Sequence, residues 1–554
     1  MSGEGLARAV LRHAERRPDL RVASYLRSDG EVGESLGYAE LAGRASTLAR
    51  RLADTIEPGA RVLLSAHNTP EFAIAFFACQ FGGYTAVPAP LDHGAMSPGK
   101  ADRLRHVLRV SDPSAMLCAA SAADEARAWL DRYGAADTPV IAVSLHDEVD
   151  AAPTPARGVS GAPALIQFTS GSEAAPRGVV IGGAAIEDNV ARIMAAWAMD
   201  EHDLAFNWMP LYHDMGLVGG LITPVCGGFR CLQWSAAQFV RRPERWMDLS
   251  ERHGVTTTGG PPFALERAIM AARSARGEAG SPDGLSGLKR VYCGAQPVPA
   301  DLLDRFAATF APRGLRRDAV FCTYGLAEAT LYVAGRPGAP HREPAPEFVA
   351  GMTLDAAARR IVRLVDPDTG AEVAEGEIGE VELSGPSLAD GYRGEGEARA
   401  DAFLTGPHRL RTGDLATIRG GALFIVGRSK DVFFANGRKI AAATLEFAAA
   451  RLHPALDPHG AVTVEAPGPV TASGPELILR IERKSRRDII DDEAALERRI
   501  AAQLTREFGV RIAQVEFLPP RALPRTPSGK VRRRAHMLGG AEVEHAGGDV
   551  MAEA

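Results

Sequence analysis

Short apolar runs alternate with longer amphipathic stretches over about the first 150 residues of the chain. Residues 38–53 have apolar positions at helical spacing, and Arg61–Ser65 is a short apolar run typical of a buried strand. A helix is expected at Glu71–Phe81, followed by a strand at Thr85–Val87 that Pro88 closes. This alternation predicts a mostly parallel sheet covered by helices.

A second succession of the same kind is predicted after residues 151–161, which are rich in Pro, Ala and Gly and are typical of a linker. It begins with a buried strand at Ala164–Phe168 and continues to about Thr330. Beyond Arg336 the pattern becomes strand-rich. The further strands expected in these two parts are residues 205–209, 255–258, 290–293, 361–365, 379–383 and 423–426.

The pattern changes again after Gly427. A strand at 477–481, a charged amphipathic helix at 491–508 and a last strand at 515–518 indicate a small α+β domain. The expected fold class is therefore α/β, with a large N-terminal domain (1–426) of βα sub-domains with mostly parallel sheets plus a small strand-rich part. A smaller, mobile α+β domain (427–538) follows, and 539–554 is expected to be a disordered acidic tail.

Composition narrows the class of protein. With 554 residues, 46% hydrophobic and 24% charged, the chain can bury several cores. Its net charge of -6 argues against nucleic-acid binding, which selects concentrated positive charge. The six cysteines show no C-x-x-C pair, which favours buried thiols in a reducing cytosol. The charged N-terminus and the lack of a long apolar run predict a cytoplasmic protein with no membrane span.

A run of small residues follows the strand at Ala164–Phe168, where a strand passes into a loop. Thr169, Ser170, Gly171 and Ser172 allow close approach of an anion and supply N–H and hydroxyl donors, so this loop is a candidate phosphate cradle. The run lacks the lysine spacing of a P-loop, and an ordinary surface turn is the alternative.

Four further motifs follow this loop in order along the chain. They are Tyr324-Gly325-Leu326-Ala327-Glu328, Arg411-Thr412-Gly413-Asp414-Leu415, Gly427-Arg428-Ser429-Lys430-Asp431 and Pro524-Arg525-Thr526-Pro527-Ser528-Gly529-Lys530. Each motif is weak alone, but the five collinear matches resemble the signature set of the adenylate-forming superfamily. That superfamily includes acyl-CoA synthetases, luciferases and peptide-synthetase adenylation domains.

Within the superfamily, Asn207–Leu217, Thr257–Ala264, Ala327 and the segment Arg61–Pro90 are similar to fatty acyl-AMP ligases. The resemblance implies an acid–thiol ligase that activates a carboxylic acid, expected to be a fatty acid, as an acyl adenylate with release of pyrophosphate. The acyl group then passes to the phosphopantetheine thiol of an acyl carrier protein. Because the chain shows no carrier motif, the carrier is expected in trans.

The resemblance also implies roles for charged residues, using ATP and Mg²⁺ as cofactors. Lys530 would bridge the carboxylate and the α-phosphate, Asp414 would accept hydrogen bonds from the ribose hydroxyls, and Glu328 would hold Mg²⁺. The alternatives are a solvated lysine, an aspartate in a turn and a carboxylate at a helix start. His213 would orient the acyl carboxylate, or else be hydrogen-bonded structure.

Tyr324 would stack on adenine, with core packing as the alternative, and Lys430 would lie at the hinge of the small domain. Gly219, Gly220 and the Thr257–Phe263 segment would shape the acyl tunnel. The complete set of expected nucleotide-binding residues is Thr169, Ser170, Gly171, Ser172, Arg177, Gly294, Ala295, Gln296, Pro297, Thr323, Tyr324, Gly325, Leu326, Ala327, Asp414 and Arg428.

Three departures from the superfamily pattern qualify this prediction. The phosphate loop carries Glu173 and Ala174, with Arg177 in place of the usual lysine. The segment Gly437–Glu446 keeps its first glycine and last glutamate but lacks Tyr-Pro and Asp, and the stretch from Glu328 to Ile361 is short. Two alternatives therefore stay open, an acyl-CoA synthetase that uses CoA as acceptor and a degenerate relative that binds without turnover.

Overall fold

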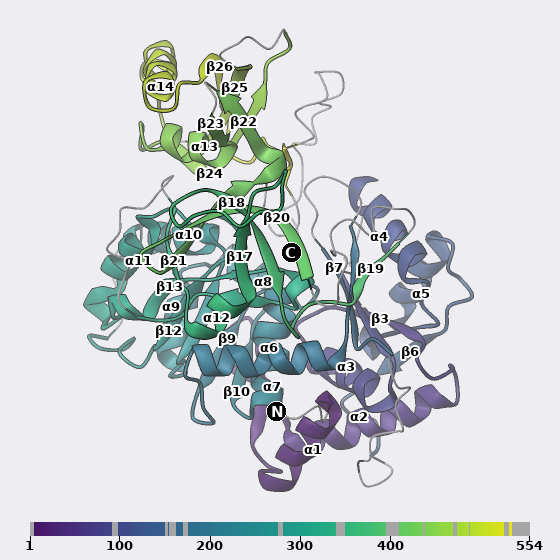
Figure 1. Ribbon diagram of the computed structural model, residues 1–554. Helices are drawn as coiled ribbons and strands as arrows, with labels where there is room; N and C mark the ends of the chain where they lie inside the picture. The colour runs from purple at the N-terminus through teal and green to yellow at the C-terminus, as the bar shows by residue number, and fades with distance from the viewer. Residues whose placement is uncertain are drawn as a thin grey trace.

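The computed structural model describes residues 5–90, 98–149, 153, 162–169, 176–274, 281–338, 349–394, 409–435, 438–468, 474–486, 488–525 and 531–533. Among these residues, three larger β-sheets and the two-stranded pair of β14 (Tyr324–Gly325) and β15 (Tyr332–Ala334) form a large lobe, and a smaller lobe rises above it (Figure 1).

The first sheet of the large lobe has seven strands in the order β19-β8-β7-β4-β3-β5-β6. Its central pairs are parallel, whereas β7–β8 and β8–β19 are antiparallel. Helices cover it, as the alternating pattern predicts. The bounds are β3 (Arg61–Ser65), β4 (Thr85–Ala89), β5 (Ala115–Ala119), β6 (Val140–Val143), β7 (Leu165–Phe168), β8 (Gly178–Ile181), β19 (Gly391–Arg393), α2 (Tyr38–Ala53), α3 (Pro70–Gly82), α4 (Pro98–Ser111) and α5 (Ala123–Arg132).

The second sheet also has seven strands, in the order β13-β12-β11-β9-β10-β1-β2, and all of its pairs except β1–β2 are parallel. The bounds are β1 (Arg21–Leu26), β2 (Val32–Gly37), β9 (Leu204–Asn207), β10 (Arg230–Gln233), β11 (Thr257–Gly260), β12 (Arg290–Cys293), β13 (Val320–Cys322), α1 (Leu6–Arg16), α6 (Gly183–Ala196), α7 (Thr223–Gly227), α9 (Arg245–Arg252), α10 (Pro262–Ser274) and α11 (Leu302–Phe310).

The two sheets do not follow the order of the chain, and this corrects the predicted succession. The strand at Leu165–Phe168, which we expected to open the second succession, pairs with β4 of the first sheet. The early strands β1 and β2 instead extend the second sheet beside β10. Pairing partners are chosen by long-range packing, which local pattern does not encode. Pro88, expected to end its strand, lies within β4 opposite Leu64.

A third, five-stranded antiparallel sheet has the order β16-β21-β20-β18-β17, and the small lobe contains a three-stranded sheet, β24-β25-β26. The bounds are β16 (Met352–Thr353), β17 (Val362–Val365), β18 (Gly379–Ser384), β20 (Arg409–Arg419), β21 (Ala422–Arg428), β22 (Val432–Ala435), β23 (Arg438–Ala441), α13 (Ala442–Ala450), β24 (Leu456–Glu465), β25 (Glu476–Arg483), α14 (Glu493–Phe508) and β26 (Arg511–Leu518).

Helix α14 shows why the small lobe folds as the pattern predicts. The Asp492 carboxylate accepts a hydrogen bond from the Ala495 N–H at 2.8 Å, which caps the helix, and Gly509 ends it with φ 73°. Leu496, Ile500 and Leu504 are buried at four-residue spacing. They belong to a hydrophobic cluster built from residues 433–517, which is distinct from the large-lobe core.

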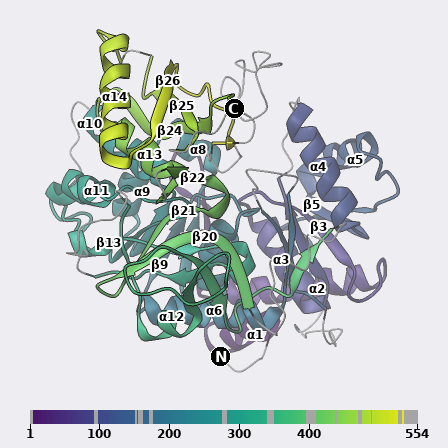
Figure 2. The same ribbon diagram turned by 45° about the horizontal axis from the view of Figure 1, so that its top comes forward.

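The two lobes meet through α13 and β21, which lie beside each other in Figure 2. Phe447 of α13 packs with Val349, Leu415 and Phe424 in a cluster of its own. β21, a strand of the large lobe, continues through Gly427 and ends at Arg428. The chain therefore passes into the small lobe at the following 3₁₀ turn, η8 (Ser429–Asp431). The contact between the lobes is therefore small compared with the core of either lobe.

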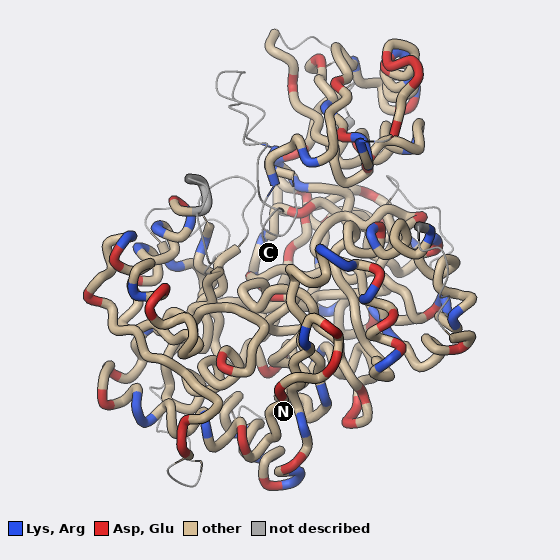
Figure 3. The backbone as a smooth tube through the Cα atoms, turned by 180° about the vertical axis from the view of Figure 1, so that it is seen from behind, with Lys and Arg blue, Asp and Glu red and all other residues tan. Residues whose placement is uncertain are grey.

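All six cysteines are free and buried, as predicted. Basic and acidic residues are interspersed over the described backbone (Figure 3). No helix in the described ranges has both the length and the apolar character needed to cross a bilayer.

Candidate functional site

Tyr324, Asp414 and Arg428 meet where the third sheet faces the end of the second. Tyr324, in strand β14 (Tyr324–Gly325), donates a hydrogen bond from its hydroxyl to Asp414 Oδ2 at 2.7 Å. Arg428 lies opposite Asp414 in the β20–β21 register, and its Nε is 3.0 Å from Asp414 Oδ1. Burial, and then the Asp414 charge, raise the pKa of Tyr324 well above its usual value, so this hydroxyl remains a donor.

Glu328 is presented by a tight turn that only glycine can begin. A Cβ at Gly325 would lie 1.9 Å from the Leu331 carbonyl oxygen, so any other residue would open the turn. The chain then returns as β15 (Tyr332–Ala334), with Glu328 in a 3₁₀ turn between the strands. Buried Thr330 has φ 65°, a rare conformation for a β-branched residue, and its hydroxyl bonds to the Ser387 carbonyl at 2.7 Å. Backbone strain of this kind is typical of functional sites.

The buried carboxylate of Glu328 contacts two side chains from the first sheet. Its Oε1 accepts a hydrogen bond from the Tyr392 hydroxyl at 2.7 Å and forms an ion pair with Arg177 at 3.2 Å. The Arg177 guanidinium carbon also lies 4.4 Å from the centre of the Tyr392 ring, a cation–π contact. Arg177 is half-exposed and Glu328 is buried, so the arginine can reach a ligand while Glu328 holds it.

The base of the expected phosphate loop is closed between β7 and β8. The Thr169 N–H donates to the Arg177 carbonyl at 3.0 Å, and the Arg177 N–H donates to Thr169 Oγ1 at 3.3 Å. Arg103 of α4 donates from Nη2 to the Thr169 carbonyl at 3.1 Å. Ser170, Gly171, Ser172, Glu173 and Ala174 lie outside the described residues.

Arg103 also connects this loop electrostatically to the small lobe. Burial lowers the pKa of the Arg103 guanidinium, and the positive charge of Arg532 lowers it further. Arg532 follows Lys530 by two residues, and Lys530 itself lies outside the described residues. Arg532 is therefore near enough to Arg103 for the two positive charges to repel each other.

Two buried carboxylates of the small lobe fix the ends of the segment that carries Lys530. Before it, Arg525 forms an ion pair with Glu482 at 2.7 Å and donates to the His459 carbonyl at 2.9 Å. After it, Arg533 pairs with Glu446 and, at 3.3 Å, with Asp431 of η8. Burial opposes the charge of Arg533, but the two carboxylates outweigh it and raise its pKa.

The remaining predicted residues lie at the carboxyl ends of neighbouring strands, the usual place for ligands in an α/β sheet. Gly294–Pro297 follow β12, and Thr323 follows β13; the Thr323 N–H donates to the Cys293 carbonyl at 2.8 Å. Ala295 has a positive φ of 69°, so this turn is sharp. Leu326 and Ala327 belong to the turn that presents Glu328.

His213 stands on the segment between β9 and the π-helix η2 (Met215–Ile222). Its ring is tilted against that of Tyr212, with 4.9 Å between the ring centres. Gln167 of β7 donates to the Tyr212 carbonyl at 2.6 Å, which joins this segment to the strand before the phosphate loop. The histidine is half-buried.

Glu328 offers the chemistry that a magnesium ion would need. No cluster of three or more His, Cys, Asp or Glu side chains suited to a metal occurs within the described ranges. Mg²⁺ beside a nucleotide is usually held by one or two carboxylates together with phosphate oxygens, so a single buried carboxylate fits. The contacts described above all engage Oε1 of Glu328, which leaves Oε2 for an ion.

Sequence reasoning missed Tyr392 and Arg103. Tyr392 lies on the three-residue edge strand β19, of sequence Gly-Tyr-Arg, far along the chain from the other motifs, and the aromatic residue beside a glycine was its only signal. Arg103 lies on α4, 66 residues before Thr169 in the chain, and no local pattern distinguishes it from its neighbours.

Comparison with known proteins identifies the family. The model of the family described as "AMP-binding enzyme" matches residues 10–393, which is more than half of the chain. The chain belongs to the AMP-binding enzyme family.

Three curated relatives of this AMP-binding enzyme align over most of both chains. Long-chain-fatty-acid–AMP ligase FadD28 of Mycobacterium bovis is 30% identical over 95% of this chain and 96% of its own length. Putative fatty-acid–CoA ligase fadD25 of Mycobacterium tuberculosis is 29% identical over 93% of each chain. Medium-chain-fatty-acid–[acyl-carrier-protein] ligase JamA of Moorena producens is 30% identical over 92% of this chain and 91% of its own.

Solved structures agree with this assignment. A structure from a study of fatty acyl-adenylate ligases of E. coli and L. pneumophila superposes with a TM-score of 0.76 and 28% identity, over 96% of both chains. The expected α/β fold with mostly parallel sheets and an additional strand-rich sheet is thus confirmed for this AMP-binding enzyme.

Proposed function

We propose that this protein activates a carboxylic acid, expected to be a fatty acid, with ATP and Mg²⁺. The product is an acyl adenylate, and pyrophosphate is released. The acyl group then passes to the phosphopantetheine thiol of a carrier protein supplied in trans in the cytoplasm. The relatives named as fatty-acid–AMP and acyl-carrier-protein ligases support both steps.

The nucleotide would be seated between the third sheet and the turn at Glu328. Asp414 has two carboxylate oxygens suited to the two ribose hydroxyls, and Tyr324 and Arg428 hold this carboxylate in place. Gly294–Pro297, Thr323 and Tyr324 would line the adenine side. Binding both ribose hydroxyls would orient the α-phosphate for attack by the acid carboxylate. Holding the two reacting groups in this geometry would lower the activation barrier of the adenylation step.

The triphosphate would lie against Arg177 and the Thr169–Ser172 loop. Arg177 forms an ion pair with the Glu328 carboxylate. A phosphate of ATP could take the place of this carboxylate, because both groups are anions that accept hydrogen bonds from a guanidinium. Glu328 would hold Mg²⁺, which neutralises phosphate charge when bound. Arg103 would fix the strand end from which the loop starts.

The small lobe would supply Lys530 to the bond-forming atoms. We propose that the chain works as two domains, 1–426 and 427–538, that turn about Lys430 in the η8 turn. The limited contact through Phe447 supports such a motion. Lys530 would neutralise the charge that develops between the acid carboxylate and the α-phosphate.

One observation carries this proposal. Two buried carboxylates, Asp414 and Glu328, each accept a hydrogen bond from a tyrosine hydroxyl and form an ion pair with an arginine. This arrangement suits a bound nucleotide with its metal. The test is pyrophosphate release across a panel of carboxylic acids, together with detection of acyl-AMP. Acid-dependent release with acyl-AMP is expected; no release with any acid would support a binding protein without turnover.

CoA is the second candidate acceptor. The relative named as a putative fatty-acid–CoA ligase and the short stretch from Glu328 to Ile361 favour it. Incubation of the enzyme, ATP and acid with either CoA or a holo carrier protein separates the two acceptors. Acyl-carrier formation without acyl-CoA is expected, and acyl-CoA as the main product would reverse the assignment.

A further inference from the structure

Helix α4 packs on the first sheet beside the two strands that flank the expected phosphate loop. Leu104, Val107 and Leu108 are buried at helical spacing and share a hydrophobic cluster with Ile166 and Phe168 of β7. This packing fixes both the position and the rotation of the helix. The polar side chains on its other faces therefore have fixed positions relative to the ends of β7 and β8.

His106 of this helix contacts the residue just before Arg177. Its Nε2 lies 2.9 Å from the Pro176 carbonyl oxygen. A carbonyl oxygen can only accept a hydrogen bond, so Nε2 carries the hydrogen. On the other side of the ring, Arg109 Nη2 lies 3.4 Å from Nδ1, and a guanidinium can only donate. Arg109 therefore favours the tautomer in which His106 donates to Pro176.

The peptide group between Pro176 and Arg177 is held at both of its polar atoms. His106 donates to its carbonyl oxygen, and its N–H donates to Thr169 Oγ1 at 3.3 Å. The Arg177 carbonyl in turn accepts from the Thr169 N–H at 3.0 Å, and Arg103 donates to the Thr169 carbonyl at 3.1 Å. The backbone on both sides of the Arg177 Cα is thus fixed, which sets the direction in which the side chain leaves the main chain.

The same helix also supports a partner of the Arg177 side chain. Arg393 of β19 donates from Nε to the Val110 carbonyl of α4 at 2.8 Å. Its neighbour Tyr392 places its ring under the Arg177 guanidinium and donates to Glu328. Helix α4 therefore fixes the backbone of Arg177 and, through β19, one of the contacts that hold its guanidinium.

We propose that His106 is a positioning residue for Arg177, and that its hydrogen bond to Pro176 aims the Arg177 guanidinium at a phosphate of ATP. The inference rests on the proposed function and assigns His106 no contact with the nucleotide itself. The imidazole acts through the backbone of Arg177. Its loss should therefore weaken the use of ATP and leave the use of the carboxylic acid unchanged.

The test measures kcat and the KM values for ATP and for the acid, from pyrophosphate release. His106→Leu removes the donor and should raise the KM for ATP by about threefold to tenfold, the effect of one lost hydrogen bond, with the KM for the acid unchanged. His106→Gln places an amide donor near the position of Nε2 and should stay close to the wild-type enzyme. His146→Leu, the same change at an exposed histidine, is the control and should alter neither KM.

A double-mutant cycle shows whether His106 acts through Arg177. If it does, His106→Leu should have little further effect on the KM for ATP in a protein that already carries Arg177→Gln, because the side chain that it aims is gone. The same fold-increase with and without Arg177 would give His106 a route to the nucleotide that bypasses the arginine, and would overturn the inference.

The remaining outcomes separate this inference from the proposed function. If His106→Leu lowers kcat and thermal stability with the KM for ATP unchanged, the histidine is only structural and the inference is wrong, while the ligase function stands. An equal rise of the KM in His106→Gln would show that the donated hydrogen bond is not what matters, and would also overturn it. If the wild-type enzyme releases no pyrophosphate with any acid, the proposed function fails. Calorimetric titration with ATP then tests the inference, because His106→Leu should weaken binding by the same factor.

Discussion

Arg177 and Glu328 are 151 residues apart in the chain, and their side chains form an ion pair at 3.2 Å. The same carboxylate oxygen accepts the Tyr392 hydroxyl, and the Tyr392 ring lies under the Arg177 guanidinium. Two residues from distant parts of the sequence, Glu328 and Tyr392, thus hold the Arg177 guanidinium just before β8. We expect the arginine to exchange Glu328 for a phosphate when ATP binds.

Replacement of Arg177 tests this exchange. Arg177→Gln removes the positive charge and should raise the KM for ATP by about tenfold or more, the effect expected for loss of a charge-assisted hydrogen bond. Arg177→Lys keeps the charge without the planar fork and should have an intermediate KM. Pyrophosphate release at varied ATP measures both. An unchanged KM in Arg177→Gln would show that the arginine serves Glu328 alone.

Asp414 should matter more to nucleotide binding than the tyrosine that holds it. Asp414→Asn removes the charge that accepts the ribose hydroxyls and should weaken ATP binding by about 10- to 100-fold, since hydrogen bonds to charged groups contribute about 1.5–3 kcal/mol. Tyr324→Phe removes only the hydroxyl that donates to Asp414 Oδ2, so its effect should be smaller. Calorimetric titration with ATP compares them. Equal losses would mean that Tyr324 itself contacts the nucleotide.

Lys530 is expected to act in the transition state. Lys530→Ala should lower the adenylation rate by several orders of magnitude and leave ATP binding nearly intact. Single-turnover formation of acyl-AMP, beside an ATP titration, measures the two effects separately. Lys484→Ala, at an exposed position whose Nζ donates to the Pro454 carbonyl, is the matched control for loss of a lysine in the same lobe. A large loss of ATP affinity in Lys530→Ala would show that the lysine binds the ground state.

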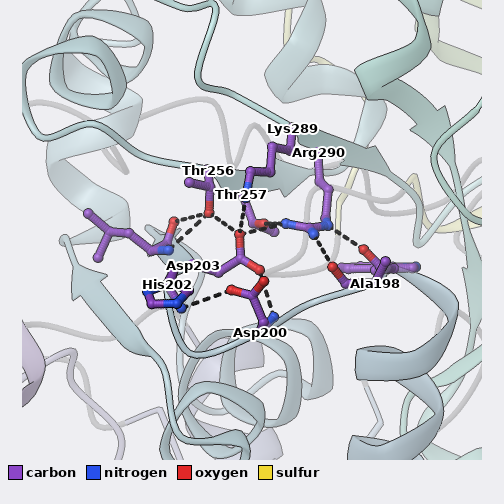
Figure 4. A network of polar contacts seen from close by, with 10 residues as sticks. Ala198, Asp200, His202, Asp203, Thr256, Thr257, Lys289 and Arg290 are labelled. Atoms are coloured by element: carbon purple, nitrogen blue, oxygen red, sulfur yellow. Dashed lines mark hydrogen bonds and ion pairs between the residues drawn. The ribbon is translucent and has the colours of Figure 1, made fainter.

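The Asp203–Arg290 pair, drawn in Figure 4 with its hydrogen-bond partners, should be important for stability. Asp203 is fully buried and Arg290 nearly so, and Asp203→Asn would leave the guanidinium buried without its counter-charge. Breaking such a pair costs about 3–5 kcal/mol. Urea unfolding at pH 7 measures the loss. Asp124→Asn, which breaks the exposed Asp124–Arg127 pair, is the control and should change the midpoint little.

The same carboxylate predicts a dependence of stability on pH. Burial raises the pKa of Asp203, but hydrogen bonds from the Asp200 N–H, Thr256 and Arg290 outweigh it and lower the pKa overall. The stabilisation is therefore present above the unfolded-state value of about 3.9 and is lost as the pH falls through the lower folded-state value. The wild-type protein should lose more stability between pH 5 and 3 than Asp203→Asn.

The sequence predicted elements best where a local signal was sufficient. Residues 38–53, Arg61–Ser65 and Arg290–Cys293 form the expected helix and strands, because apolar spacing and turn residues define them. The sequence did not predict which strands pair with each other. β19 has only three residues, and its pairing with β8 is what makes it a strand. Register and edge order depend on contacts between distant residues, which a local pattern does not contain.

In the candidate site, too, the sequence indicated single residues but not the contacts between them. The motif glycines and carboxylates were predicted individually, and the structure brings Tyr324, Asp414 and Arg428 into one contact network. The roles of these residues stay predictions. Tyr392 and Arg103 were missed because their significance is a matter of burial and of partners, and neither can be read from residue type.

The crossing of strands between the two large sheets limits how the chain can be divided. β1 and β2 precede the strands of the first sheet yet extend the second, and β19 follows the strands of the second sheet yet closes the first. Two fragments made by a cut between β6 and β7 would each need strands that the other carries. Engineering that exchanges acid-binding modules between relatives should therefore transplant residues 21–393 as one cassette.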